Sequence, residues 1–308
     1  MRLLTRSDFD GLVCAALLYE AEIITDIKFV HPKDVQDGKI EVTTDDVLAN
    51  VPYAAGCGLW FDHHASETDR LNLKDGMKYE GDSREAPSAA RVIFDYYGGT
   101  AKFKDMETNG LMAAVDKCDS GQFDKNDILN PEGWVLLSFV MDPRTGLGRY
   151  KDYRISNYQL MEKLSHKCRH ESVANILSDT DVQERIKRYF EQEAEYEGMV
   201  QKYTRTDRNV LIIDLHDCPE IVTGNRFKEY VLYPDQNISI RIIWGFQKQN
   251  MVMTVGHSVF NRSSKTNVGK LMLKYGGGGH PYVGTCQVPV DNWEAVRDEI
   301  IATLKAEG

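Results

Sequence analysis

Apolar and polar positions follow two different periods along the chain. In the first hundred residues, short apolar runs between polar turns predict strands, and longer segments with apolar residues every three or four positions predict helices. One such helix, Ala89 to Tyr97, is followed by two glycines, which commonly end helices. The predicted strands cover residues 3–4, 27–30, 47–51 and 58–61. This alternation predicts a parallel α/β sheet covered by helices.

From Pro131 onward the pattern becomes helical, and a second strand-rich region follows. The predicted helices cover residues 134–141, 155–164 and a highly charged segment at 181–203. The predicted strands cover residues 210–213, 238–244 and 251–255. We therefore predict two α/β domains: a parallel-sheet domain with its helical extension and linker at 1–203, and a smaller domain at 204–308.

Composition limits the classes of function that remain. A chain of 308 residues is longer than one hydrophobic core usually reaches, which also favours two domains. No apolar run approaches the roughly 18 residues that a membrane span requires. The formal net charge of −10 argues against binding long duplex nucleic acid. Small phosphorylated ligands need only a local positive pocket, so the net charge does not exclude them.

Cysteine usage and the first residues favour a cytoplasmic protein. The six cysteines are scattered singly, with no C-x-x-C pair, and are expected to be reduced thiols. Asp8 and Asp10 interrupt any apolar segment that a secretory signal would need.

Four short motifs carry the candidate chemistry, and the first is Ser7-Asp8-Phe9-Asp10-Gly11. It places two carboxylates on a predicted turn from strand to helix. Ligands bind at the carboxyl edge of parallel sheets, and neighbouring carboxylates can hold hard cations. The alternative is structural, with Asp10 capping the following helix.

The second motif, Asp62-His63-His64, directly follows a predicted strand. Adjacent side chains on an extended segment point in opposite directions, so we expect only one of the two histidines to meet a metal. The other would be left to act on a substrate. Polar surface residues at a strand end are the alternative interpretation.

The third motif runs from Val115 to Gly121 at the end of a helical pattern. Asp119, just before Ser-Gly, can complete an acidic cluster, although the spacing leaves open whether Asp116 or Asp119 is the ligand. The alternative is a helix end at Gly121 with no further role.

The fourth motif is the run of four glycines at 276–279 followed by His280, preceded along the chain by Arg262 and Ser263. Four glycines in succession cost backbone entropy, so a mere turn is an unusual use for them. Their bare amides can instead bind phosphate oxygens. Arg262 can add a bidentate contact and His280 a further donor.

In this order, the motifs resemble the DHH phosphoesterases that carry a DHH-associated C-terminal domain. That group includes RecJ-type exonucleases, the oligoribonucleases called nanoRNases and exopolyphosphatase-related proteins. The resemblance covers nearly the whole chain. It implies hydrolysis of phosphoester or phosphoanhydride bonds that depends on Mn²⁺, with Mg²⁺ as the alternative, in a cleft between the domains. It also implies a small nucleotide or short oligonucleotide as substrate, and it is compatible with a homodimer.

The resemblance also implies roles for individual residues. The implied metal ligands are Asp8, Asp10, His63 and Asp119. The resemblance places His64 near the scissile phosphate, and Asp62 of the same motif is a further catalytic candidate. Arg6 is a catalytic candidate for a different reason, because it could pair with Asp8 or bind a phosphate oxygen in place of a cation. The implied substrate-binding residues are Arg262, Ser263, Gly277, Gly278, Gly279 and His280.

Two positions depart from the family pattern. Members usually carry a histidine two residues before the first aspartate, where this chain has Arg6, and an aspartate at the end of the strand before DHH, where it has Asn50. Arginine cannot coordinate a cation, because its guanidinium has donors only. We therefore expect one metal ion rather than two, unless a shifted strand brings Asp45 or Asp46 into the place of Asn50.

The sequence thus predicts a metal-dependent phosphoesterase for short oligonucleotides or small nucleotides. One alternative is a nucleotide-binding sensor with a weakened metal centre, for which Arg6 and Asn50 are the argument. The other is an exopolyphosphatase, which differs in substrate more than in chemistry.

Overall fold

The computed structural model describes residues 1–64, 67 and 79–308. They form two compact units, which we call unit 1 (Met1–Gln122 and Leu129–Glu191) and unit 2 (Phe123–Ile128 and Gln192–Gly308). The charged segment predicted as one helix forms two helices, α11 (Thr180–Glu191) and α12 (Glu193–Lys202), and the chain passes from unit 1 to unit 2 between them. The predicted domain boundary at 203/204 lies one helix further on.

Unit 1 contains a parallel sheet, as predicted from the alternation of apolar runs, and its five strands have the order β2-β1-β3-β4-β5. Its strands are β1 (Arg2–Thr5), β2 (Asp26–Phe29), β3 (Asp46–Ala49), β4 (Leu59–Asp62) and β5 (Gly81–Ser83). Its helices include α1 (Phe9–Glu20), α2 (Pro32–Gln36), α4 (Ala89–Tyr96), α5 (Lys104–Thr108), α6 (Leu111–Asp119), α8 (Gly133–Met141), α9 (Asn157–Lys167), α10 (Val173–Ser178) and α11. Short 3-10 turns are η1 (Gly99–Ala101), η2 (Pro143–Thr145) and η3 (Leu147–Arg149).

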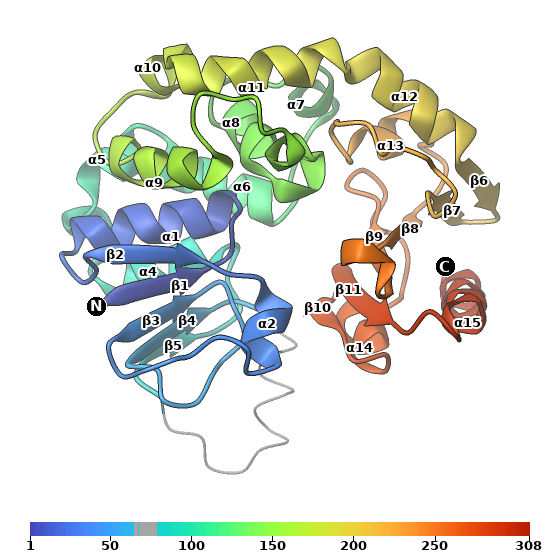
Figure 1. Cartoon of the computed structure of the whole chain (residues 1–308), viewed down its shortest axis with the longest axis horizontal. Helices are drawn as coiled ribbons and strands as arrows, with labels where there is room; N and C mark the ends of the chain where they lie inside the picture. The colour runs from blue at the N-terminus through green and yellow to red at the C-terminus, as the bar shows by residue number, and fades with distance from the viewer. Residues whose placement is uncertain (65–66, 68–78) are drawn as a thin grey trace. The chain divides into compact units, whose positions relative to one another are not determined.

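Alternate residues of these strands face opposite sides of the sheet. Leu4, Leu48 and Trp60 pack on one side together with Val35 of α2. Helix α1 is buried along most of its length, and α9 lies against its outer side (Figure 1). The rings of Tyr19 in α1 and His166 in α9 are 4.4 Å apart. Both sides of the sheet are therefore covered, as parallel sheets require.

The strand register brings the chemistry-bearing motifs to one edge of the sheet. Thr5 of β1 pairs with Ala49 of β3, and Ala49 pairs with Phe61 of β4. The segments that follow these strands, which begin at Arg6, Asn50 and the histidines after Asp62, therefore all start at the carboxyl edge.

Unit 2 contains a mixed six-stranded sheet with the order β10-β11-β9-β8-β7-β6, in which β7 and β8 are parallel and the other pairs antiparallel. Its strands are β6 (Thr204–Asp207), β7 (Val210–Asp214), β8 (Ile238–Trp244), β9 (Met251–His257), β10 (Gly278–His280) and β11 (Val283–Val288). Its helices are α12, α13 (Lys228–Leu232), α14 (Val268–Leu273), α15 (Trp293–Ala306) and most of α7 (Lys125–Leu129), with a 3-10 turn η4 (Phe246–Lys248).

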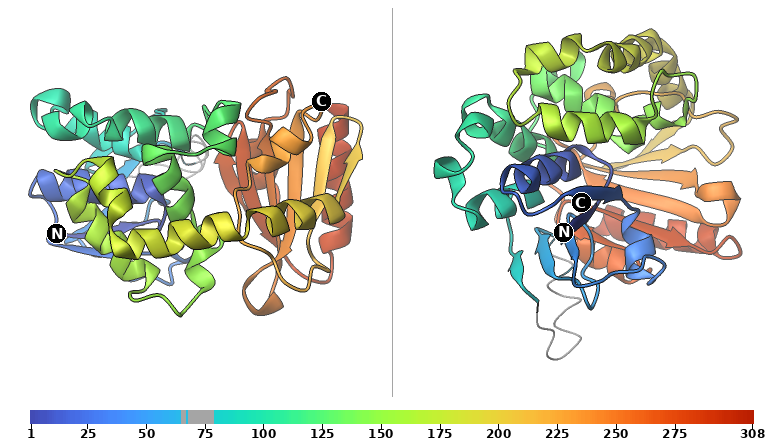
Figure 2. Two further views of the ribbon diagram at one scale, coloured as in Figure 1. Left: turned by 90° about the horizontal axis from the view of Figure 1, so that it is seen from above. Right: turned by 60° about the vertical axis from the view of Figure 1, so that its left-hand side comes forward.

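Helices cover both faces of this sheet. On one face, Ile212, Ile240 and Ile242 pack with Ile300 and Leu304 of α15, which runs along the sheet in Figure 2. On the other face, Leu211 and Ile213 pack against α12 through residues such as Met199 and Val200. This packing explains why α12 belongs to unit 2. Within the described residues, no helix is long and apolar enough to cross a membrane.

Candidate active site

The first motif forms the turn between β1 and α1, and Asp8 is the residue that caps the helix. Its Oδ1 accepts a hydrogen bond from the Gly11 amide at 3.0 Å, so the alternative in which Asp10 is the cap is wrong. The same Oδ1 accepts from Nδ2 of Asn50 at 3.0 Å, and Oδ2 lies 3.1 Å from Nε of Arg6. We call Arg6, Asp8 and Asn50 the Asp8 group. Both carboxylate oxygens of Asp8 are thus bound by donors of the chain itself.

Asn50 occupies the end of β3 next to Asp8, and Asp46 does not. Asp46 begins β3 at the opposite edge of the sheet, where Nε of Arg2 lies 2.7 Å from its Oδ1. Burial raises the pKa of Asp46, but the hydrogen bonds from Arg2 and Thr43 outweigh burial, so the pKa is lowered. Asn50 has a left-handed φ of 55°, which asparagine tolerates better than most residues. The structure therefore supports Asn50, and not Asp46, as the residue that stands where the family has an aspartate at the end of the strand before DHH.

Asp10 lies in the first turn of α1 and is almost fully buried. Its two oxygens accept hydrogen bonds from the amides of Ala89 and Ala90 at 3.0 and 2.9 Å, the first amides of α4. A helix N-terminus favours such a negative charge. Burial and the neighbouring carboxylate of Asp119 nevertheless raise the pKa of Asp10 to about 8. Without a cation nearby, this position favours a protonated carboxyl group at neutral pH.

His63 is buried, and its ring is oriented by a backbone carbonyl. Nδ1 lies 3.1 Å from the Ala86 oxygen, so Nδ1 carries the hydrogen of this bond. Nε2 lies 3.2 Å from Oδ2 of Asp119 and 3.7 Å from Oδ2 of Asp10. Burial would lower the pKa of His63, but the negative charges of Asp119 and Asp10 outweigh it and raise the pKa. A carbonyl behind the far nitrogen is the usual support of a metal-ligating histidine.

The two aspartates of the third motif have different surroundings. Asp116 accepts a hydrogen bond from Ser88 at 2.8 Å and forms two contacts with Arg91, at 2.9 and 2.7 Å. Asp119, the last residue of α6, lies beside His63. Loss of solvation and the charge of Asp8 raise the pKa of Asp119, and His63 opposes this shift. The geometry favours Asp119 over Asp116 as the ligand.

Asp10, His63 and Asp119, which we call the acid–histidine cluster, meet the geometric test for a metal site. One ligand atom from each lies within 4.8 Å of the others. Ligands of an octahedral cation at about 2.1 Å would be separated by about 3.0 Å when adjacent and about 4.2 Å when opposite. The separations of 3.2 and 3.7 Å fall between these values. Two carboxylates and one imidazole are also a chemically suitable donor set for a divalent cation.

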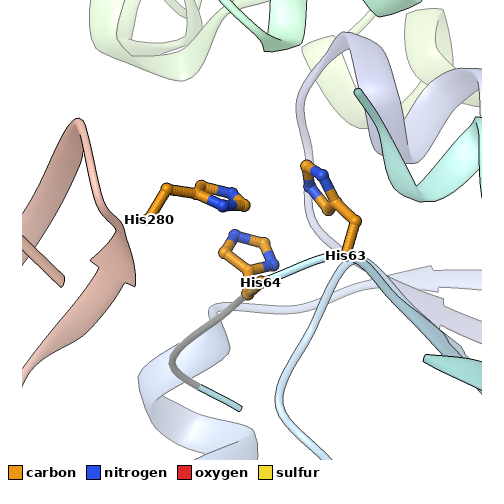
Figure 3. Close-up of side chains that lie close together, drawn as sticks. All are labelled: His63, His64 and His280. Carbon is orange, nitrogen blue, oxygen red and sulfur yellow. The ribbon is translucent and has the colours of Figure 1, made fainter. Parts of the chain in front are cut away.

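His64 takes no part in this cluster and is held by Asp62 instead. Nδ1 of His64 lies 2.8 Å from Oδ1 of the fully buried Asp62. The rings of His63 and His64 are 4.6 Å apart (Figure 3), so the expectation that they point in opposite directions is wrong. The strand β4 ends at Asp62, and its alternation of side chains therefore does not extend to the histidines. The expectation that one histidine joins the acids while the other remains outside agrees with the geometry.

Sequence reasoning missed Arg144, which follows α8 in the turn η2. Its Nε lies 2.7 Å from Oδ1 of Asp142. Burial lowers the pKa of Arg144, but the negative charges of Asp142, Asp8 and Asp119 outweigh it and raise the pKa. No local motif marks this residue, because it reaches the site only through the packing of α8.

In unit 2, much of the glycine run belongs to the sheet. Gly278 and Gly279 pair with Thr285 and Gly284 of β11, and Gly279 has a φ of +148°. A Cβ on Gly277 or Gly279 would overlap backbone atoms of β11. These glycines thus allow the backbone of β11 to come close, whereas the sequence interpretation had expected a close approach to phosphate oxygens only.

The other predicted substrate residues of unit 2 lie at the end of this strand and on the loop that follows β9. His280 ends β10 and is drawn in Figure 3. The guanidinium carbon of Arg262 lies 5.5 Å from the centre of the Tyr282 ring, just beyond β10. Ser263 accepts a hydrogen bond from Nδ2 of Asn237 at 3.0 Å. Unit 2 therefore gathers a positive side chain beside the turn that follows the glycines.

Comparisons with known proteins agree with this architecture. A scan against protein-family models gave no match, and a search of curated proteins gave none. Among solved structures, the chain is similar to the pGpG-specific phosphodiesterase PggH from Vibrio cholerae, with 48% sequence identity, a TM-score of 0.74, and coverage of 100% of this chain and 99% of that one.

Two more distant structures share the fold. One is the DHH domain of a protein described as a member of a family of ribosomal proteins, with 14% identity, a TM-score of 0.56, and coverage of 96% and 84% of the two chains. The other is an exopolyphosphatase-related protein from Bacteroides fragilis, with 12% identity, a TM-score of 0.50, and coverage of 99% and 93%. The chain belongs to the DHH superfamily of phosphoesterases, in the group with a DHH-associated C-terminal domain.

Proposed function

We propose that this protein is a metal-dependent phosphodiesterase that hydrolyses short oligonucleotides. The observation that carries the proposal is the convergence of Asp10, His63 and Asp119 at the carboxyl edge of a DHH-type sheet. The full-length similarity to a phosphodiesterase whose name specifies the dinucleotide pGpG supports the same substrate class.

The acid–histidine cluster would hold the cation. A divalent ion there supplies a Lewis acid that polarises the phosphoryl group and promotes ionisation of a water molecule. We propose Mn²⁺ rather than Mg²⁺, because Mg²⁺ prefers oxygen ligands alone whereas His63 contributes a nitrogen. We also propose one tightly bound ion per chain, because Arg6 and Asn50 already bind both oxygens of Asp8.

His64 and Asp62 would handle a proton at the scissile bond. Asp62 accepts the hydrogen of Nδ1, which leaves Nε2 of His64 as the nitrogen that faces away from Asp62 and can exchange a proton. In hydrolysis of a phosphodiester, the bond to the leaving oxygen breaks and that oxygen gains a proton. His64 Nε2 is the candidate donor, with Asp62 fixing the orientation of the ring.

Two arginines would compensate for phosphate charge near the acids. Arg144 lies close enough to Asp8 and Asp119 for their charges to raise its pKa. Arg6, whose side chain is 30% exposed, keeps part of its guanidinium accessible while it binds Asp8. Each can offer a planar set of donors to a phosphate oxygen.

In unit 2, we propose that Arg262, Ser263, His280 and the glycines 277–279 bind a phosphate of the substrate. An acidic protein with a few aimed donors suits one terminal phosphate better than a long polyanion. We therefore expect short oligonucleotides to be better substrates than long polyphosphate.

A substrate series tests the proposal. We expect pGpG to be hydrolysed faster than a hexanucleotide or long polyphosphate in the presence of Mn²⁺, and we expect all turnover to stop with excess chelator. Separated products can be quantified by chromatography. Turnover that survives chelation, or polyphosphate as the best substrate, would contradict the proposal.

Arg262→Ala tests the part assigned to unit 2. Loss of a charge-assisted contact should weaken binding of pGpG by about 1.5–3 kcal/mol. Arg205→Ala is the matched control, because Arg205 is exposed on β6, at the edge of the sheet opposite to β10. Equal affinities in both variants would remove Arg262 from the site.

The second candidate function is that of a nucleotide sensor. The observation that favours it is that both carboxylate oxygens of Asp8 already contact donors of the chain itself. A sensor would bind pGpG without cleaving it. Thermal shift separates the two functions, since a ligand at about 100 times its Kd stabilises the protein by about 2.7 kcal/mol whether or not it is hydrolysed. Stabilisation with intact pGpG in the sample after incubation with Mn²⁺ would identify the sensor.

We place the protein in the cytoplasm, where such nucleotides are degraded and thiols stay reduced. The six cysteines form no disulfide among themselves, and all six lie in the described residues. A homodimer stays a prediction.

A further inference from the structure

Tyr282 is one of several exposed aromatic residues of this protein, and it lies next to the glycine run. It lies in the turn between β10 and β11, two residues after His280, and it is 53% exposed. Of the other large aromatic side chains, those of Trp60, Phe61 and Tyr230 are buried. The exposed ring therefore does not contribute to a core.

The backbone at Tyr282 is nevertheless held firmly. The carbonyl of Tyr282 accepts a hydrogen bond from the His257 amide at 2.8 Å, and the carbonyl of Pro281 accepts one from the Val268 amide at 2.9 Å. The turn is thus attached to the end of β9 on one side and to α14 on the other. An exposed ring on a fixed backbone keeps its place when a ligand binds, which lowers the entropic cost of binding.

The ring itself is supported by a neighbouring side chain as well. The ring of His257 stands nearly perpendicular to that of Tyr282, at 82° with the centres 5.3 Å apart, a favourable edge-to-face arrangement. His257 is itself buried, and its Nε2 donates to the carbonyl of Thr266 at 2.9 Å. The partner behind Tyr282 is therefore rigid, and the exposed part of the ring faces solvent.

The position of Arg262 indicates what this surface could bind. Its guanidinium carbon lies 5.5 Å from the centre of the ring, within the range of a cation–π contact. A positive side chain beside an exposed aromatic ring matches the two halves of a nucleotide, a phosphate and a flat base. Aromatic side chains next to positive groups are the common means of holding single-stranded nucleic acid.

We propose that the exposed ring of Tyr282 is the stacking surface for the base of the nucleotide whose phosphate binds at Arg262. This inference rests on the proposed function. Contacts to the phosphate alone would not depend on which base the nucleotide carries. Stacking on Tyr282 would add a contact that does. Since every base has a π-face, the contact contributes affinity and favours the larger purines over pyrimidines.

The test combines a change in the protein with a change in the substrate. Wild type and Tyr282→Ala are compared on pGpG and on two analogues of pGpG, each lacking one of the two bases. We expect removal of the stacked base to raise the KM of wild type by about tenfold or more. In Tyr282→Ala the KM for pGpG should rise similarly, and removal of the same base should then have little further effect.

Conservative variants separate stacking from a structural role. Tyr282→Phe and Tyr282→Trp keep a flat ring and should retain a KM near that of wild type, with kcat unchanged throughout. Phe246→Ala is the matched control, because Phe246 is a 79% exposed aromatic residue of the same unit. It lies between β8 and the start of β9, whereas Tyr282 contacts His257 at the end of β9. This variant should leave the KM unaltered.

The outcomes distinguish this inference from the proposed function. Additive effects of Tyr282→Ala and of base removal, or a KM that rises equally in Tyr282→Phe, would overturn the stacking role while hydrolysis of pGpG continues. Absence of pGpG hydrolysis by wild type would instead contradict the proposed function. In that case the same comparison of affinities, measured by calorimetry with pGpG and its base-free analogues, still decides whether Tyr282 stacks on a base.

Discussion

The Asp8 group and the acid–histidine cluster are built on aspartates only two residues apart in one turn, yet the chain treats the two carboxylates differently. Asp8 receives a positive charge from Arg6 and an amide from Asn50. Asp10 receives two backbone amides and the thiol of Cys14 but, among the described residues, no positive side chain other than that of His63, and it has Asp119 beside it. The first carboxylate is neutralised by the protein, whereas the second is left with an excess of negative charge. In the proposed function, a cation would therefore balance the charge on one side of the site, whereas Arg6 and Asn50 would largely take its place on the other.

The largest expected effect comes from removing a ligand of the cluster. Asp119→Asn should abolish tight cation binding and lower turnover of pGpG about a thousandfold or more, because several kcal/mol of charge stabilisation are lost. Steady-state kinetics with Mn²⁺ and elemental analysis of the purified protein measure both effects.

Asp116→Asn is the control for this prediction, since Asp116 belongs to the same helix but pairs with Arg91. It should lose some stability and keep its cation and most of its activity. The reverse result, with Asp116 needed for the cation and Asp119 dispensable, would reverse the assignment. Asp10 is a less clean target, because its removal would also leave the amides of Ala89 and Ala90 without partners.

The next effect concerns the proton at the scissile bond. His64→Ala should lower kcat by about 10²- to 10⁴-fold, the usual contribution of a general acid or base, and leave the bound cation in place. Asp62→Asn should lower kcat less, because the ring of His64 loses orientation but not its proton. His170→Ala, at an exposed histidine far along the chain, should have no effect. A loss of cation in His64→Ala would show that His64 is a ligand instead.

A third prediction alters the Asp8 group itself. Arg6→His together with Asn50→Asp removes both side-chain donors from Asp8, leaves the amide of Gly11, and adds an imidazole and a carboxylate beside it. We expect the number of tightly bound Mn²⁺ ions to rise from one to two per chain, as measured by elemental analysis and titration calorimetry. Two tightly bound ions in the unaltered protein would contradict the inference that Arg6 and Asn50 take the place of a cation at Asp8.

The smallest expected effect is on stability in the absence of metal. The pKa of Asp10 is raised to about 8 in the folded protein, against about 4 for an unfolded aspartate, so the folded state binds more protons between these values. Stability of the metal-free protein should therefore fall as pH rises from about 4 to about 8. The raised pKa of His63 acts in the same direction.

Thermal unfolding measures this dependence. Each kcal/mol should shift Tm by roughly 2–4 °C for a chain of this size. Excess Mn²⁺ should remove most of the decline, because the cation takes the place of the protons. In Asp10→Asn the decline should be smaller even without metal. A Tm that rises over this pH range in the metal-free protein would show that the cluster is not electrostatically strained.

Several parts of the fold were predictable because they depend on local pattern. Apolar runs located β1, β2, β3 and β4, and the glycines after Tyr97 marked the end of α4. Strands β5, β6, β10 and β11 were missed. The first three are short, polar or glycine-rich segments that join a sheet only because a neighbouring strand is present, and β11 has only three buried residues among its six. The break at Gln192 between α11 and α12 was missed for a similar reason: each helix packs on a different unit.

For the site, the sequence by itself determined which residue types stand at the ends of strands and helices: the acids after β1, the histidines after β4 and the aspartates at the end of α6. These follow from short-range spacing. Only the tertiary structure decided among them, because the choice depends on contacts between segments distant in the chain. Arg91 binds Asp116 and leaves Asp119 for the cluster, Asn50 meets Asp8, and Arg144 arrives from another helix. Charge neutralisation acts through space, and a linear pattern does not contain the distances that set it.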